Sequence, residues 1–152
     1  MRTLLPHKQL KLNLPNEFDG IVGIAALCDL RPNEIILFEH ACELVGIQLR
    51  SEARALPNMP TNIFFVGENA ITLQFEPVQY GAYFTGIYYP VYKWRAAHLT
   101  DQQIITCMIE EMCHVFWGIR DEIQVEYKVL DVVHVRYPEL NLGDLYSTEW
   151  LQ

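Results

Sequence analysis

Residues 100–117, with the sequence TDQQIITCMIEEMCHVFW, constrain the fold most strongly, because they form a long run without glycine or proline. Thr100 and Gln103 have the T-x-x-Q spacing of a capping box, in which each side chain bonds to the other residue's backbone N–H. At about 100° per residue, the apolar side chains between Ile104 and Phe116 gather on one arc of a helix. The run therefore predicts an amphipathic helix that ends before Gly118.

A second helix is predicted after the short turn GIR at residues 118–120. Asp121 is placed to cap the segment EIQVEYKVLDVVHV, which begins at residue 122. Residues 123–129 alternate apolar and polar side chains, so a strand is the alternative. The uninterrupted length of residues 119–137 favours a helix, because single strands are usually shorter. The two helices would form a hairpin in which residues equidistant from Gly118 face one another.

The middle of the chain is rich in β-branched and aromatic residues, which favour strands. The segments NIFFVG, AITLQFEP and GAYFTGIYYPVYKW are separated by GEN and PVQYG, a pattern that predicts strands joined by short turns. Before them, RPNEIILFEHACELVG predicts a helix that stops at Gly46, with short strands expected at LKLNLP and IQLRS. We expect one α+β domain over residues 1–152, with a small antiparallel sheet, helices packed on one side and a C-terminal helical hairpin.

The net charge of −8 is concentrated in the C-terminal third of the chain. Residues 1–100 contain 9 acidic and 8 basic residues, whereas residues 101–152 contain 10 acidic and 3 basic residues. An acidic region of this kind repels nucleic acid phosphates and attracts cations or a basic protein. We therefore expect a peptide or protein partner and no nucleic acid; the sequence does not indicate the oligomeric state.

The sequence also bears on the cellular compartment. It contains no uncharged apolar run of 18 residues, so we expect no membrane span. The first 15 residues lack the continuous apolar core of a secretory signal. The four cysteines show no CxxC spacing and lie in apolar runs. Reduced thiols in a cytoplasmic protein are the expected state.

Acidic side chains and one histidine gather on the predicted hairpin. Glu110 and His114 are four residues apart and share a helix face, with Glu111 about 100° around. The hairpin would place Glu122 near His114 and Glu126 near Glu110, on a stripe shared with apolar residues. Buried carboxylates need a partner or a metal, so a divalent metal site is predicted, either zinc or a harder ion such as manganese or iron. The alternative is a solvated helix face with a histidine near its C-terminal end, where the helix dipole favours a cation.

The string Glu110-Glu111-Met112-Cys113-His114, followed by EIQVE, resembles the motif helix of the zincin-like metallopeptidases, in particular the small gluzincins. Their HExxH motif is here E-E-x-x-H, with a glutamate in place of the first histidine. By layout the resemblance covers residues 33–135. It implies that Glu110 and His114 are metal ligands and that Glu122 or Glu126 is the third ligand. It also implies that Glu111 is the general base that activates water.

The replaced histidine leaves two functions open. One is a metal-dependent hydrolase related to the peptidases, either active or an inactive relative. The other is a non-enzymatic binding protein whose acidic C-terminal third docks a basic protein partner.

Overall fold

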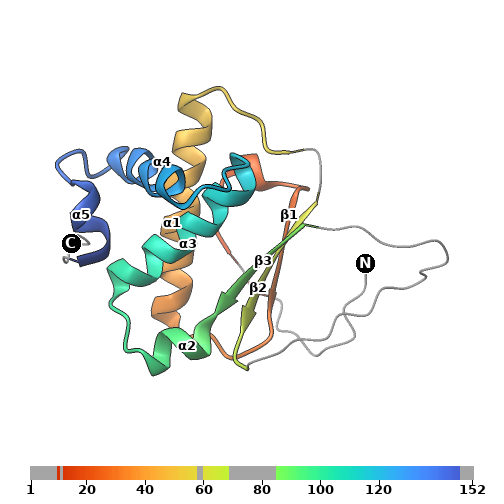
Figure 1. Cartoon of the computed structure of the whole chain (residues 1–152). Coiled ribbons are helices and arrows are strands. Elements are labelled where there is room, and N and C mark those ends of the chain that lie inside the picture. The colour runs from red at the N-terminus through yellow and green to blue at the C-terminus, as the bar shows by residue number, and fades with distance from the viewer. Residues whose placement is uncertain (1–9, 11, 58–59, 69–84, 148–152) are drawn as a thin grey trace.

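The computed structural model describes residues 10, 12–57, 60–68 and 85–147. In chain order the elements are the 3-10 turn η1 (Asn16–Phe18), β1 (Val22–Ala26), α1 (Pro32–Ser51), β2 (Thr61–Val66), β3 (Thr85–Pro90), α2 (Val91–Ala96), α3 (Asp101–Phe116), α4 (Glu122–His134) and α5 (Leu142–Ser147). Figure 1 shows α1, α3, α4 and α5 on one side of a small sheet. The prediction of helices packed on one side of a sheet is therefore confirmed.

The sheet has the strand order β1-β2-β3, and both pairs of strands are parallel. The prediction of an antiparallel sheet is therefore wrong. Parallel neighbours need a long connection that returns the chain to the same end of the sheet, and α1 makes this connection between β1 and β2. Five of the six side chains of β2 are buried, and such nearly continuous burial is typical of strands in parallel sheets. The predicted strand AITLQFEP lies outside the described residues.

Helix α1 is longer than predicted. It continues to Ser51, so the segment IQLRS is helical and not a strand. Gly46 does not stop the helix but allows close packing, because a Cβ at this position would lie 2.8 Å from ring atoms of Pro15. The predicted strand LKLNLP is also absent from its described residues, 10 and 12–15. In the segments IQLRS and LKLNLP, tertiary packing therefore outweighs the local sequence pattern that favours a strand.

Aromatic side chains join the helices to the sheet. Phe38 of α1 packs edge-on against Phe65 of β2, with 4.9 Å between the ring centroids. Tyr89 of β3 is completely buried, and its hydroxyl donates a hydrogen bond of 2.7 Å to the carbonyl of Met108 in α3. A buried phenol needs such a partner. This bond fixes α3 against β3 two residues before Glu110.

The predicted helical hairpin is confirmed. The capping box between Thr100 and Gln103 opens α3, and both of its hydrogen bonds are present. The side chain of Asp121 accepts a hydrogen bond from the backbone N–H of Gln124 and opens α4, so the segment is a helix and not a strand. Gly118 lies in the connection with a φ of +66°, which a residue with a side chain rarely adopts.

Two further expectations concern the cysteines and membranes. All four cysteines are free thiols, and Cys42 and Cys113 are fully buried. Burial raises the pKa of both of these thiols, which keeps them protonated and unreactive. Among the described residues, no helix has both the length and the apolar character needed to cross a membrane.

Glu52, at the end of α1, holds the hairpin in place. Its carboxylate accepts hydrogen bonds from Trp117 at 2.7 Å, from Lys128 of α4 at 2.8 Å and from Gln48 at 2.6 Å. Desolvation acts to raise the pKa of Glu52, but these hydrogen bonds outweigh it and lower the pKa to about 2. Trp117, just before the hairpin turn, and Lys128, in the middle of α4, therefore bind the same carboxylate.

A second carboxylate joins the start of α1 to α2. Glu34 has 5% of its surface exposed and accepts two hydrogen bonds from Arg95, of 2.9 and 2.8 Å. It also accepts a hydrogen bond of 2.7 Å from the backbone N–H of Arg31. Burial acts to raise the pKa of Glu34, but the hydrogen bonds from Arg95 and Arg31 outweigh it, so the pKa is lowered.

Replacing Arg95 with alanine leaves Glu34 buried without its ionic partner, so we expect the free energy of unfolding to fall by about 3 kcal/mol. Arg50→Ala is the control, because Arg50 pairs with Glu17 at 2.8 Å but has 53% of its side chain exposed. Surface pairs of this kind contribute about 1 kcal/mol or less. Urea unfolding at neutral pH measures both losses. Equal losses would contradict a dominant role for the buried pair.

Glu52→Gln should weaken the fold in a pH-dependent way. A carboxylate whose pKa is lowered from 4.5 to about 2 stabilises the fold above pH 4.5, and this contribution is lost as the pH falls toward 2. We expect the wild type to be more stable than Glu52→Gln by about 1–2 kcal/mol at neutral pH, because solvent screens part of the interaction. Denaturant unfolding across this pH range measures the difference, which should close in acid. A difference that stayed constant would count against the interaction.

Candidate metal centre

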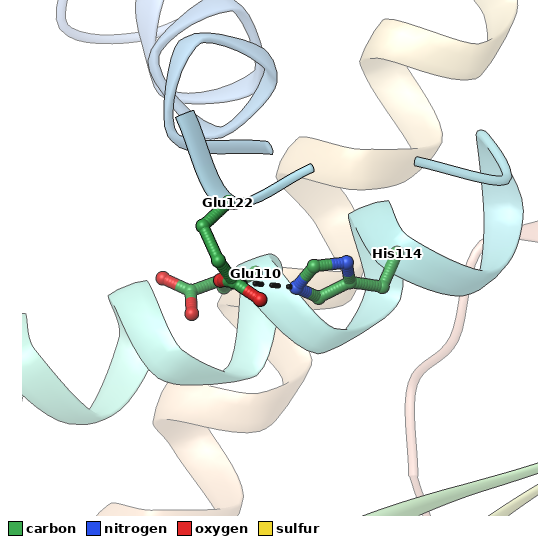
Figure 2. Close-up of side chains that lie close together, drawn as sticks. All are labelled: Glu110, His114 and Glu122. Carbon is green, nitrogen blue, oxygen red and sulfur yellow. Dashed lines mark ion pairs between the residues drawn. The ribbon is translucent and has the colours of Figure 1, made fainter. Parts of the chain in front are cut away.

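Glu110, His114 and Glu122 come together where α3 ends and α4 begins (Figure 2). One ligand atom from each residue lies within 4.8 Å of the other two. The Nε2 atom of His114 and the Oε2 atom of Glu122 are 3.8 Å apart and point toward one another from the two helices. Carboxylate oxygen and imidazole nitrogen are both common ligands of divalent metals. The three residues form a group that can hold a divalent metal ion.

The hairpin connection explains this convergence. Glu110 and His114 project from successive turns of α3, four residues apart. The turn at Gly118 reverses the chain, and the cap at Asp121 makes Glu122 the first residue of α4. Glu122 therefore faces back toward the last turn of α3, and the prediction that it lies near His114 is confirmed.

The ring of His114 is held by the same turn. Its Nδ1 atom lies 2.6 Å from the carbonyl oxygen of Ile119. A carbonyl only accepts, so Nδ1 carries the proton and donates it. In the neutral ring the lone pair is then on Nε2, the atom that faces Glu122. A histidine that binds a metal through Nε2 has this arrangement, with its other nitrogen bonded to a carbonyl or carboxylate.

Glu110 is held by Tyr146 of α5. The hydroxyl of Tyr146 donates a hydrogen bond of 2.7 Å to the Oε2 atom of Glu110. Desolvation, this hydrogen bond and the charges of Glu110 and Glu126 all raise the pKa of Tyr146, so the hydroxyl remains a donor. The sequence did not identify Tyr146, because no motif marks the tail and the two partners are 36 residues apart.

Glu111 and Glu126 lie near this group but are not among its three members. Glu111 is exposed at the surface, yet nearby protein desolvates its carboxyl and raises its pKa. Glu110 and Glu122 add to this rise, and His114 opposes it. Glu126 is half-buried and acts electrostatically on Tyr146. Of the two third ligands that the resemblance allowed, the structure brings Glu122 to His114.

Glu122 is more exposed than its predicted inner stripe implied, with 77% of its side chain accessible to solvent. The reason is its place at the first position of α4, where the helix starts at the surface. Ligand atoms bound at about 2.1 Å to a tetrahedral ion lie about 3.4 Å apart. Atoms up to 4.8 Å apart must therefore close by up to about 1.4 Å. An exposed glutamate can do this by a change of rotamer, so the donor set fits a divalent ion.

Comparison of the chain with models of protein families, with curated proteins and with solved structures finds no match. The assignment of a function must therefore come from the chemistry of the site. Its central features are the three converging ligands, the oriented ring of His114 and the hydrogen bond from Tyr146 to Glu110.

Proposed function

We propose that the protein is a zincin-like, metal-dependent hydrolase that acts on peptides. The observation that supports it is the convergence of Glu110, His114 and Glu122 within 4.8 Å. Two of these residues are four apart on one helix, and the third begins the next helix. This is the arrangement of ligands that the resemblance to the small gluzincins implies.

The ligands suit zinc, and the two carboxylates also suit harder ions such as manganese and iron. When bound, such an ion supplies Lewis-acid polarisation of water or of a carbonyl group. Glu110 and Glu122 would hold it through carboxylate oxygens and His114 through Nε2. Glu111 follows Glu110 on α3 and is exposed to solvent, so its carboxylate is accessible to take a proton from the attacking water.

A second function is favoured by the charges around the site. Glu111, Asp121 and Glu122 are exposed, and Glu110 stands where an active zincin has a histidine. These carboxylates would attract the lysine and arginine side chains of a basic protein partner without any catalysis. Binding of that kind would weaken as salt is added, because exposed charges are screened.

The metal is tested first. Protein purified without chelator should contain about one divalent ion per chain, measured by elemental analysis, and His114→Ala should reduce the affinity by about 100-fold or more, because one of three ligands is lost. The control is His98→Asn, which changes an exposed histidine on the loop before α3 and suits its φ of +52°. A metal-free wild type whose thermal stability is unchanged by chelator would contradict the proposal.

Glu111→Gln separates the two functions. In a hydrolase it should lower the rate of peptide cleavage by about 100-fold to 10,000-fold while metal affinity stays close to that of the wild type, because the general base is lost and the ligands are kept. A mixture of fluorogenic peptides provides the assay, and Glu139→Gln, at another exposed carboxyl, is the control. Salt-sensitive binding of basic peptides, with metal bound and no cleavage by the wild type, would instead favour the binding protein.

A further inference from the structure

The three members of the metal group are held to different degrees. The ring of His114 is fixed by the carbonyl of Ile119, whereas the side chain of Glu122 is largely exposed. Within the described part of the chain, the hydrogen bond from Tyr146 restrains Glu110 from outside the hairpin. The hydroxyl bonds to the Oε2 atom of this carboxylate, which has two oxygens and can accept more than one partner.

The place of Tyr146 is itself fixed by α5. The neighbouring residue Leu145 is completely buried, and its carbonyl lies 3.1 Å from the hydroxyl of Thr106 in α3. The start of α5 is closed by Asp144, whose side chain accepts a hydrogen bond of 2.7 Å from the backbone N–H of Asn141. A buried leucine and a buried hydroxyl therefore dock α5 just before Tyr146.

Helix α5 docks on the face of α3 that carries the metal group. Thr106, Glu110 and His114 follow one another at intervals of four residues and so share one side of α3. Thr106 meets Leu145, and Glu110, one turn further along, meets Tyr146. His114, another turn along, meets Glu122 of α4. The two contacts from α5 and the contact between His114 and Glu122 therefore lie on the same side of α3.

We propose that Tyr146 is a positioning residue that holds Glu110 ready to bind the ion, so that docking of α5 and metal binding stabilise one another. This inference rests on the proposed function, since it assigns a role within the same site. A glutamate that is already oriented loses less conformational freedom when it binds a metal. A phenol also suits this task because it is neutral and does not compete with the ion, as a lysine or arginine would.

The test compares Tyr146→Phe with Tyr127→Phe, which removes the hydroxyl of an exposed tyrosine on α4. Titration calorimetry with zinc, manganese and cobalt measures the affinities. Loss of a group that orients a metal ligand typically weakens binding by about 10-fold to 100-fold, and we expect this for Tyr146→Phe. Tyr127→Phe should stay within about twofold of the wild type. The visible spectrum of bound cobalt should change only in Tyr146→Phe, because the coordination by Glu110 is altered.

Hydrogen exchange provides a second measurement that a purely structural role would not affect. Coupling between two events is reciprocal, so metal should slow amide exchange in residues 142–147 of the wild type. In Tyr146→Phe this slowing should be lost, even where the metal concentration is raised to saturate the site. Metal protects α5 through the Glu110–Tyr146 contact, and the variant lacks that contact.

The outcomes separate the two proposals. If the wild type binds metal but Tyr146→Phe keeps its affinity within about twofold and its exchange pattern, the role of Tyr146 is wrong and the metal site stands. The same holds if Tyr146→Phe and Tyr127→Phe lose affinity equally. If the wild type binds none of the three metals, the proposed function is wrong, and the role of Tyr146 falls with it.

Discussion

The buried hydrogen bond from Tyr89 to the carbonyl of Met108 sets the position of α3, and the arrangement of the other helices depends on that position. Among the residues that the structure describes, Tyr89 is the largest fully buried side chain, and it also packs against Phe38, Phe65 and Trp94. One residue therefore contacts the central strand, α1, α2 and α3. Because a phenol cannot be buried without a partner, its hydroxyl selects one register of α3 against the sheet. The positions of Glu110 and His114 on α3 are determined by that register.

The helices of the hairpin could be predicted from the sequence, whereas the sheet could not. Capping residues such as Thr100 and Asp121 act within one turn of helix, so their signal is local. The direction of a strand depends on which strand pairs with it, and aromatic or β-branched composition is the same for both directions. A sign of a parallel sheet in the sequence is the apolar run IFFV in β2, which does not alternate with polar residues, and all four of these side chains are buried. The prediction that a helix stops at Gly46 was wrong for a similar reason, because this glycine allows a close contact with Pro15, which is distant in the chain.

In the candidate site, too, the features set by local sequence could be predicted, whereas those set by contacts distant in the chain could not. The nearness of Glu122 to His114 follows from helical spacing and the position of the turn, both of which the sequence contains. The solvent exposure of Glu122 could not be predicted from a helical wheel, because a wheel describes the sides of a helix and Glu122 lies at the end of one. The contact between Tyr146 and Glu110 depends on the docking of α5, which is determined by the burial of Leu145 and the hydroxyl of Thr106. Such a contact joins segments far apart in the chain, and no local pattern encodes it.

The charges of the site bear on which cation it would attract. The carboxylates of Glu110 and Glu122 have oxygens within 4.8 Å of one another. Two such charges repel by on the order of 1 kcal/mol in water and by more where protein excludes water. Any cation, including a lysine of a basic partner, would relieve that repulsion. The ring of His114 distinguishes the two cases. A surface that attracts a basic protein gains from carboxylate charge alone and has no need of an imidazole in a fixed tautomer. Here the bond to Ile119 places the lone pair of the neutral ring on Nε2, which faces Glu122, and this arrangement favours a metal ion over a basic side chain.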